Sequence, residues 1–145
     1  DQRTYDQDPR FGLVVLCEIA CRALSPAVND PGTAIDVVGT LTRLFHLWAR
    51  AREASTTEPL HDRIFAPDLR EQDLFDDAFN GLARDGAGLV EVSIRLQKAF
   101  QAISGFGDND LRDASIEHAQ RALARNELAM TLPQDIEAVR SAARF

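Results

Sequence analysis

Long apolar runs, cysteine and lysine are all scarce in this chain of 145 residues. The longest uninterrupted apolar run, Leu13 to Cys17, is far shorter than the ~20 residues that a membrane-spanning helix needs. The opening DQRTYDQDPR is polar and charged, so we do not expect it to be a signal peptide. Basic residues number 16 against 23 acidic ones, and from the resulting net charge of −7 we expect no basic-patch protein. The same charge argues against nucleic acid or an anionic lipid surface as the main partner.

Two cysteines and three histidines leave little material for a disulfide framework or a metal centre. Cys17 and Cys21 lie four residues apart in one predicted helix, a spacing that puts both on one face but gives poor geometry for a bond between them. We therefore expect two reduced, buried thiols, as is usual in the cytosol. His46, His61 and His118 occur singly, without ligand-like spacing, so the sequence predicts no metal and no cofactor.

Catalytic motifs are missing as well. The sequence holds no phosphate-binding GxxxxGK(S/T), no GxGxxG, no HExxH and no GxSxG. Ser25 precedes a proline and has no histidine near it in the sequence, which is typical of a turn residue. The acidic clusters at 73–77 and 108–113 lie at predicted helix starts, where carboxylates are favoured, and they lack the spacing of a calcium-binding loop. An enzyme is therefore the least supported class.

Apolar periodicity predicts helices along almost the whole chain. Residues 9–24 are apolar on nearly all sides, which predicts a helix surrounded by others. The sequence shows neither βαβ alternation nor a fixed-period repeat, so we predict an all-α single domain over 1–145, with five to six helices around that central apolar helix. The expected helices cover 9–24, 31–54, 69–84, 88–103 and 110–130, with a short sixth from Pro133. Residues 1–8 form a polar lead-in, and 55–68 form an internal loop with at most one short extended segment near Ile64.

A group of polar residues lies at the joint between the first two predicted helices. Its members fall within twelve residues: Arg22, Ser25, Asn29, Asp30 and Thr33. Buried polar groups need partners, so we favour an internal brace in which Arg22 pairs with Glu18 or Asp30 while the short side chains cap the second helix. The alternative is a pocket for a small ligand or an ion.

The string DPRFGLVVLCEIACRALSPAVNDPGTAIDVV, residues 8–38, resembles the soluble C-terminal region of a bacterial family described as predicted membrane proteins of unknown function. It follows the family pattern DPxFGLxxLxxIAxRALSPxxNDPxTA, with Gly32 at a position that bulkier residues also occupy. Beyond residue 38 only the coarse order of elements is similar. The resemblance implies a parent protein with transmembrane helices upstream, and it implies no activity, substrate or cofactor.

These observations lead to one preferred function and two alternatives. The chain opens at Asp1 and its only methionine is Met130, so we expect a piece of a longer protein, tethered to the bacterial inner membrane through missing N-terminal segments. We predict a soluble, cytoplasmic interaction or regulatory domain that binds no nucleic acid. Apolar residues beside the main stripes of the later helices, Val90, Ile94 and Leu128, predict a homodimer packed through helix faces. The alternatives are a small-ligand or ion sensor that uses the polar joint, and, with least support, an enzyme.

Overall fold

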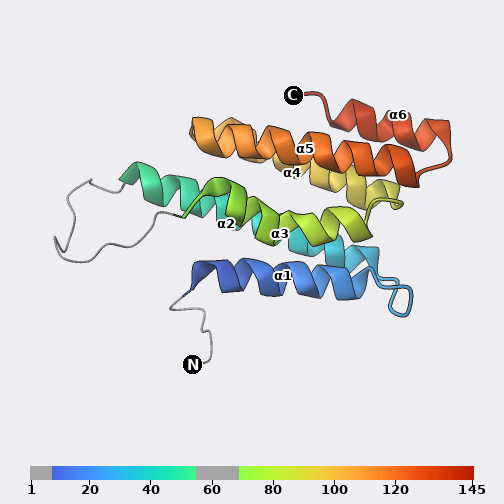
Figure 1. Cartoon of the computed structure of the whole chain (residues 1–145), viewed down its shortest axis with the longest axis horizontal. Helices are drawn as coiled ribbons and strands as arrows, with labels where there is room; N and C mark the ends of the chain where they lie inside the picture. The colour runs from blue at the N-terminus through green and yellow to red at the C-terminus, as the bar shows by residue number, and fades with distance from the viewer. Residues whose placement is uncertain (1–7, 55–68) are drawn as a thin grey trace.

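Six helices make up the part of the chain that the computed structural model describes, residues 8–54 and 69–145 (Figure 1). They are α1 (Pro9–Ala23), α2 (Pro31–Ala54), α3 (Glu71–Asp85), α4 (Val90–Phe106), α5 (Asn109–Ala129) and α6 (Pro133–Ala142). No strand occurs within these residues, and the all-α fold class is confirmed. The predicted loop at 55–68, with its extended segment, lies outside the described residues, as does most of the lead-in.

The first five helices form a closed ring of neighbours. In order around the ring, α1 contacts α3, α3 contacts α5, α5 contacts α4, α4 contacts α2, and α2 contacts α1 again. Figure 1 shows α1, α3 and α5 side by side in front, with α2 and α4 behind them. The short α6 packs against α4 and α5. The apolar faces of the five helices therefore point toward a common interior.

Four phenylalanines fill that interior. Phe45 of α2, Phe75 and Phe79 of α3, and Phe100 of α4 are all almost completely buried. The ring centroids of Phe45 and Phe75 are 4.6 Å apart, and those of Phe79 and Phe100 are 5.1 Å apart in an edge-on arrangement. Aromatic pairs at such separations add to the energy of apolar burial. The cluster ties α2, α3 and α4 together although aromatic residues are few in the chain.

The position of α1 differs from the central one that its composition predicts. Among the helices it contacts α2 and α3, it lies at the edge of the bundle, and Ile19 on its outward side is 46% exposed. The burial pattern corrects the prediction of a central helix. One side of α1 packs on the bundle, and its remaining apolar side chains face a surface groove. An all-round apolar helix is thus compatible with an edge position when part of its surface is left open.

Helix starts follow the local signals in the sequence. The side chain of Asp8 caps α1 and accepts hydrogen bonds from two backbone N–H groups of the first turn. Asp108 caps α5 in the same way through the N–H of Leu111, at 3.0 Å. Pro31 and Pro133 occupy the first positions of α2 and α6, where the missing proline N–H has no intrahelical role. These starts agree with the predicted ones to within a residue.

Candidate functional site

The polar joint forms a compact surface turn between α1 and α2. The carboxylate of Asp30 accepts hydrogen bonds from the backbone N–H of Thr33 at 3.1 Å and from its hydroxyl at 2.6 Å. These two bonds favour the ionised form and hold the pKa of Asp30 below its ordinary value. Ser25 donates from its hydroxyl to the carbonyl of Arg22 at 2.7 Å. The side chains of Ser25, Asp30 and Thr33 thus bond within the joint itself.

The backbone of the joint turns sharply at Asn29. Its φ of 50° lies in the left-handed region, which asparagine tolerates better than most residues. The next N–H, that of Asp30, then reaches back to the carbonyl of Ala23 at 2.8 Å. Arg22 is exposed, and within the described residues it forms no ion pair with Glu18 or Asp30. The observed bonds are those of a helix end followed by a helix cap.

The two cysteines face α3 at Gly81. A Cβ at that glycine would lie 2.9 Å from the Sγ of Cys21, closer than real Cβ atoms approach, and 3.1 Å from the Sγ of Cys17, which is tighter than most such contacts. Burial, together with the neighbouring Cys17, raises the pKa of the Cys21 thiol to about 12. A thiol that stays protonated is a poor nucleophile and a poor metal ligand. The pair fills the close contact between α1 and α3.

The histidines occupy different environments. His118 is buried against the ring of Phe75, with centroids 5.3 Å apart, and its Nε2 lies 3.5 Å from Oδ1 of Asp76. Burial lowers the pKa of His118 to about 4. His46 is exposed, and His61 lies outside the described residues. In the described ranges, no group of three or more His, Cys, Asp or Glu side chains is placed to hold a metal ion.

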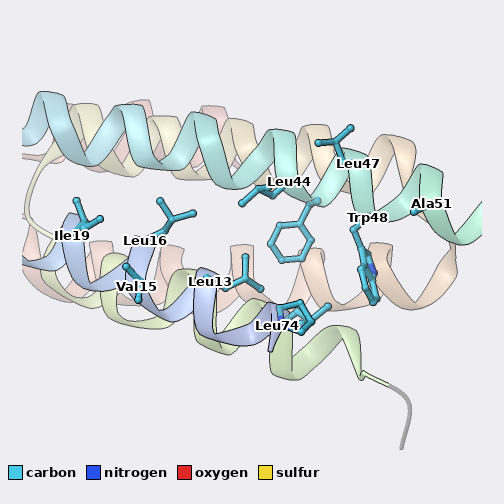
Figure 2. Close-up of a pocket in the computed structure, with 12 residues that line it drawn as sticks. Leu13, Val15, Leu16, Ile19, Leu44, Leu47, Trp48, Ala51 and Leu74 are labelled. Carbon is cyan, nitrogen blue, oxygen red and sulfur yellow. The ribbon is translucent and has the colours of Figure 1, made fainter. Parts of the chain in front are cut away.

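An open groove of about 700 Å³ runs between α1 and α2 (Figure 2). Figure 2 shows Leu16 of α1 pointing toward α2, and Trp48 of α2 extending across toward the start of α1. No joint residue lines the groove. Among the described residues, those that line the groove are all uncharged and belong to the apolar types or glycine: Pro9, Gly12, Leu13, Val15, Leu16, Ile19, Leu44, Phe45, Leu47, Trp48, Ala51 and Leu74. We call this surface the apolar groove.

Several side chains of the apolar groove are open to solvent. Leu47 is 62% exposed, Ile19 46% and Leu44 39%. Trp48 is half-buried, and its indole N–H is buried without an acceptor among the described residues. The three residues expected to form an apolar face on the later helices behave differently, since Val90 and Ile94 are half-buried and Leu128 alone is largely exposed. Three exposed apolar side chains, those of Ile19, Leu44 and Leu47, thus gather between α1 and α2.

Sequence reasoning missed this groove because it placed the helix at residues 9–24 in the centre of the bundle, with other helices on all its sides. A signal was nevertheless present in α2. Leu44 and Leu47 stand beside Phe45 and Trp48, which makes the apolar stripe wider than one packing face requires. A stripe of that width indicates either a helix buried on two sides or a helix with an open apolar face.

The fold and the groove define a helical-bundle domain with an open apolar face. The family model described as "Predicted membrane protein (DUF2254)" matches residues 1–102. Because this match covers more than half of the chain, the chain belongs to that family of predicted membrane proteins, as the resemblance implied. None of the helices in the described part of the chain combines the length and apolar character needed to cross a membrane.

Curated relatives match a short part of the chain at high identity. The uncharacterized protein Rv1290c from Mycobacterium tuberculosis and the uncharacterized protein Mb1321c from Mycobacterium bovis are each 61% identical over 41 residues. Each match covers 28% of this chain and 8% of the relative's length. The aligned part is thus a small fraction of those proteins. No solved structure matches the chain significantly.

Proposed function

We propose that this chain is the self-association domain of a bacterial membrane protein, and that two copies pair through the apolar groove. The observation that carries the proposal is the gathering of exposed apolar side chains around a groove of about 700 Å³. Contiguous exposed apolar patches on water-soluble domains usually mark contact sites. Covering such a patch is favourable by roughly 25 cal/mol for each Å² of apolar surface removed from water.

A second copy is the occupant that suits this face best. The surface carries both a hollow and projecting side chains, Ile19 and Leu47, so two copies related by a two-fold axis can insert these side chains into each other's groove. In the part of the chain that the structure describes, the groove is lined by no charged residue, although each chain carries a net charge of −7. Two acidic copies therefore meet at this face without burying like charges against each other.

Membrane attachment would strengthen such pairing. Copies held in one bilayer have a higher effective concentration than free domains, so a weak interface becomes occupied without new contacts. We propose a cytoplasmic position for the domain, since Cys17 and Cys21 are spaced poorly for a disulfide and reduced thiols are usual in the cytosol. A regulatory interaction domain of this kind is supported better than a ligand sensor at the polar joint, whose hydrogen bonds are made within the joint.

The test measures molar mass by size-exclusion chromatography with light scattering over a dilution series. We expect the chain to approach twice its 16.0 kDa at high concentration. Leu44→Glu and Ile19→Glu each place a carboxylate in the buried interface and should weaken pairing about 100-fold, since an unpaired buried charge is strongly unfavourable. Circular dichroism verifies that each variant is folded.

Leu128→Glu provides the matched control, because Leu128 is 89% exposed and lies on α5. It introduces the same charge away from the groove and should leave the dimer intact. A monomer at every concentration would overturn the proposal. The proposal would also be overturned if Leu128→Glu separated the dimer while Leu44→Glu and Ile19→Glu left it intact.

A further inference from the structure

A second groove, of about 560 Å³, lies between α2 and α4 and differs in charge from the first. Four of its lining residues carry basic side chains: Arg43 and His46 from α2, and Arg95 and Lys98 from α4. No carboxylate of the described residues lines it. A concentration of positive charge is unusual on a chain with 23 acidic and 16 basic residues. We call this surface the cationic groove.

Two guanidinium groups converge over the backbone of α2 at Gly39. A Cβ at that position would lie 3.2 Å from a terminal nitrogen of Arg95 and 3.7 Å from one of Arg43. The two arginines belong to different helices and are 52 residues apart in the sequence, yet both reach the same point. The absence of a side chain at Gly39 leaves the space that they occupy. Like charges brought together in this way repel each other unless an anion lies between them.

Neither arginine is neutralised by a carboxylate of the described residues. Arg43 donates a hydrogen bond to the hydroxyl of Thr40 at 2.9 Å, which fixes its guanidinium without removing its charge. Glu91 lies one turn before Arg95 in α4, an arrangement that favours an ion pair, but the structure forms none there and Arg95 extends toward α2. By contrast, Arg52 and Arg121 both form ion pairs with carboxylates on neighbouring helices.

The other half of the cationic groove is apolar. Leu47, Ala99, Ala102 and Phe106 line it, and the ring of His46 meets that of Phe106 edge-on with centroids 4.8 Å apart. A ligand that fits the whole groove therefore has an anionic end and an apolar end. The planar guanidinium of an arginine can donate two parallel hydrogen bonds to the oxygens of one phosphate, which makes phosphate the favoured anionic group.

We propose that the cationic groove binds a phosphate group attached to an apolar chain, with Arg43 and Arg95 holding the phosphate and Phe106 contacting the chain. Membrane phospholipids and soluble phosphorylated amphiphiles both supply this chemistry. The net charge of −7 acts against a general attraction to anionic surfaces, so recognition depends on the local geometry of the groove. The site shares only Leu47 with the apolar groove and does not depend on self-association.

Isothermal titration calorimetry of the whole chain tests the site with three probes, and the two lipids among them are kept below their micelle-forming concentrations. These are inorganic phosphate, dihexanoyl phosphatidic acid and, as the zwitterionic comparison, dihexanoyl phosphatidylcholine. We expect phosphatidic acid to bind at least tenfold more tightly than either of the other two, because only it carries both an exposed phosphate monoester and an apolar chain. Equal affinity for the two lipids would overturn the proposal.

Single charge-removing variants then locate the site. Arg95→Gln and Arg43→Gln should each weaken the binding of phosphatidic acid at least tenfold. Arg112→Gln is the matched control, since it removes the same charge from an exposed position on α5 outside the groove and should change the affinity less than twofold. If all three variants weakened the binding of phosphatidic acid equally, a specific site would be refuted and only general charge attraction would remain.

Cosedimentation with vesicles distinguishes the two sources of the ligand. The vesicles contain phosphatidylcholine with or without one fifth phosphatidic acid. If the parent chain binds the acidic vesicles and the Arg95→Gln chain does not, the proposed site is supported and its ligand is a membrane lipid. If the chain binds the soluble phosphatidic acid but not the vesicles, the proposed site is supported and its ligand is a free amphiphile. Binding to neither form overturns it.

Discussion

Acid should destabilise this protein chiefly through His118 between pH 7 and pH 5. Burial lowers the pKa of His118 to about 4 in the folded chain, against 6.5 for an exposed histidine. Between these two values the unfolded chain binds a proton that the folded chain does not. The stability that His118 contributes is therefore fully present above pH 6.5, and it is lost as the pH falls toward 4.

The magnitude follows from the two pKa values. Their difference corresponds to a total of about 3 kcal/mol, of which about 2 kcal/mol is lost by pH 5. Asp76 alone would favour the protonated ring, because its Oδ1 lies 3.5 Å from Nε2 of His118. The same carboxylate oxygen, however, also binds Arg121 at 3.2 Å, and the positive charges of Arg121 and Arg125 oppose protonation. Burial between Phe75 and Phe100 thus dominates.

Urea unfolding at pH 7 and pH 5 measures this effect. A loss of about 2 kcal/mol should lower the midpoint by about 1 M urea for a chain of this size. His118→Gln keeps a polar group at the position and removes the titration, so its midpoint should change much less between the two pH values. His46→Gln, at an exposed position, should keep the full change. If the His118→Gln chain lost as much stability as the parent, the reasoning from burial would be refuted.

Three further outcomes test the joint, the interior and the thiols. Asp30→Ala removes the cap of α2 and should lower the Tm in a thermal melt by a few degrees, whereas an unchanged Tm would contradict a bracing role. Asn126→Ala removes two buried hydrogen bonds, including one to Ser93 at 2.8 Å, and should reduce the unfolding free energy in urea by about 2–4 kcal/mol. Cys17 and Cys21 should react with a thiol reagent at pH 8 only after unfolding, and fast labelling of the native chain would contradict the raised pKa of Cys21.

The helices were predictable because their signals are local. Asp30 followed by Pro31 fixes the start of α2, and Pro133 fixes that of α6, through caps and ring constraints that act within one turn. The place of α1 in the bundle was not predictable from such signals. Periodicity shows which positions are apolar, but it does not show which other helices cover them. Ile19 belongs to an almost wholly apolar helix and is nevertheless 46% exposed.

The candidate sites divide in the same way. The cap at Asp30 and Thr33 lies within four residues, and it was predicted from sequence. The meeting of Arg43 and Arg95 at Gly39 depends on how α2 packs against α4, so neither residue carries a signal of its own. His118 likewise carries no signal in the sequence, because the main cause of its low pKa is burial, and it is buried against Phe75 and Phe100, which belong to other helices.

The two grooves share α2 as a common wall, and this arrangement determines which residues can separate the two proposals. Leu47 lines both grooves, so a substitution there would alter pairing and anion binding together and would test neither. Leu44 lines only the apolar groove, and Arg95 only the cationic one. If the Leu44→Glu chain is monomeric and still binds phosphatidic acid with parental affinity, the two sites are independent. If its affinity changes, α2 couples them, because a ligand shifts a pairing equilibrium only when it binds the single and paired forms with different affinity.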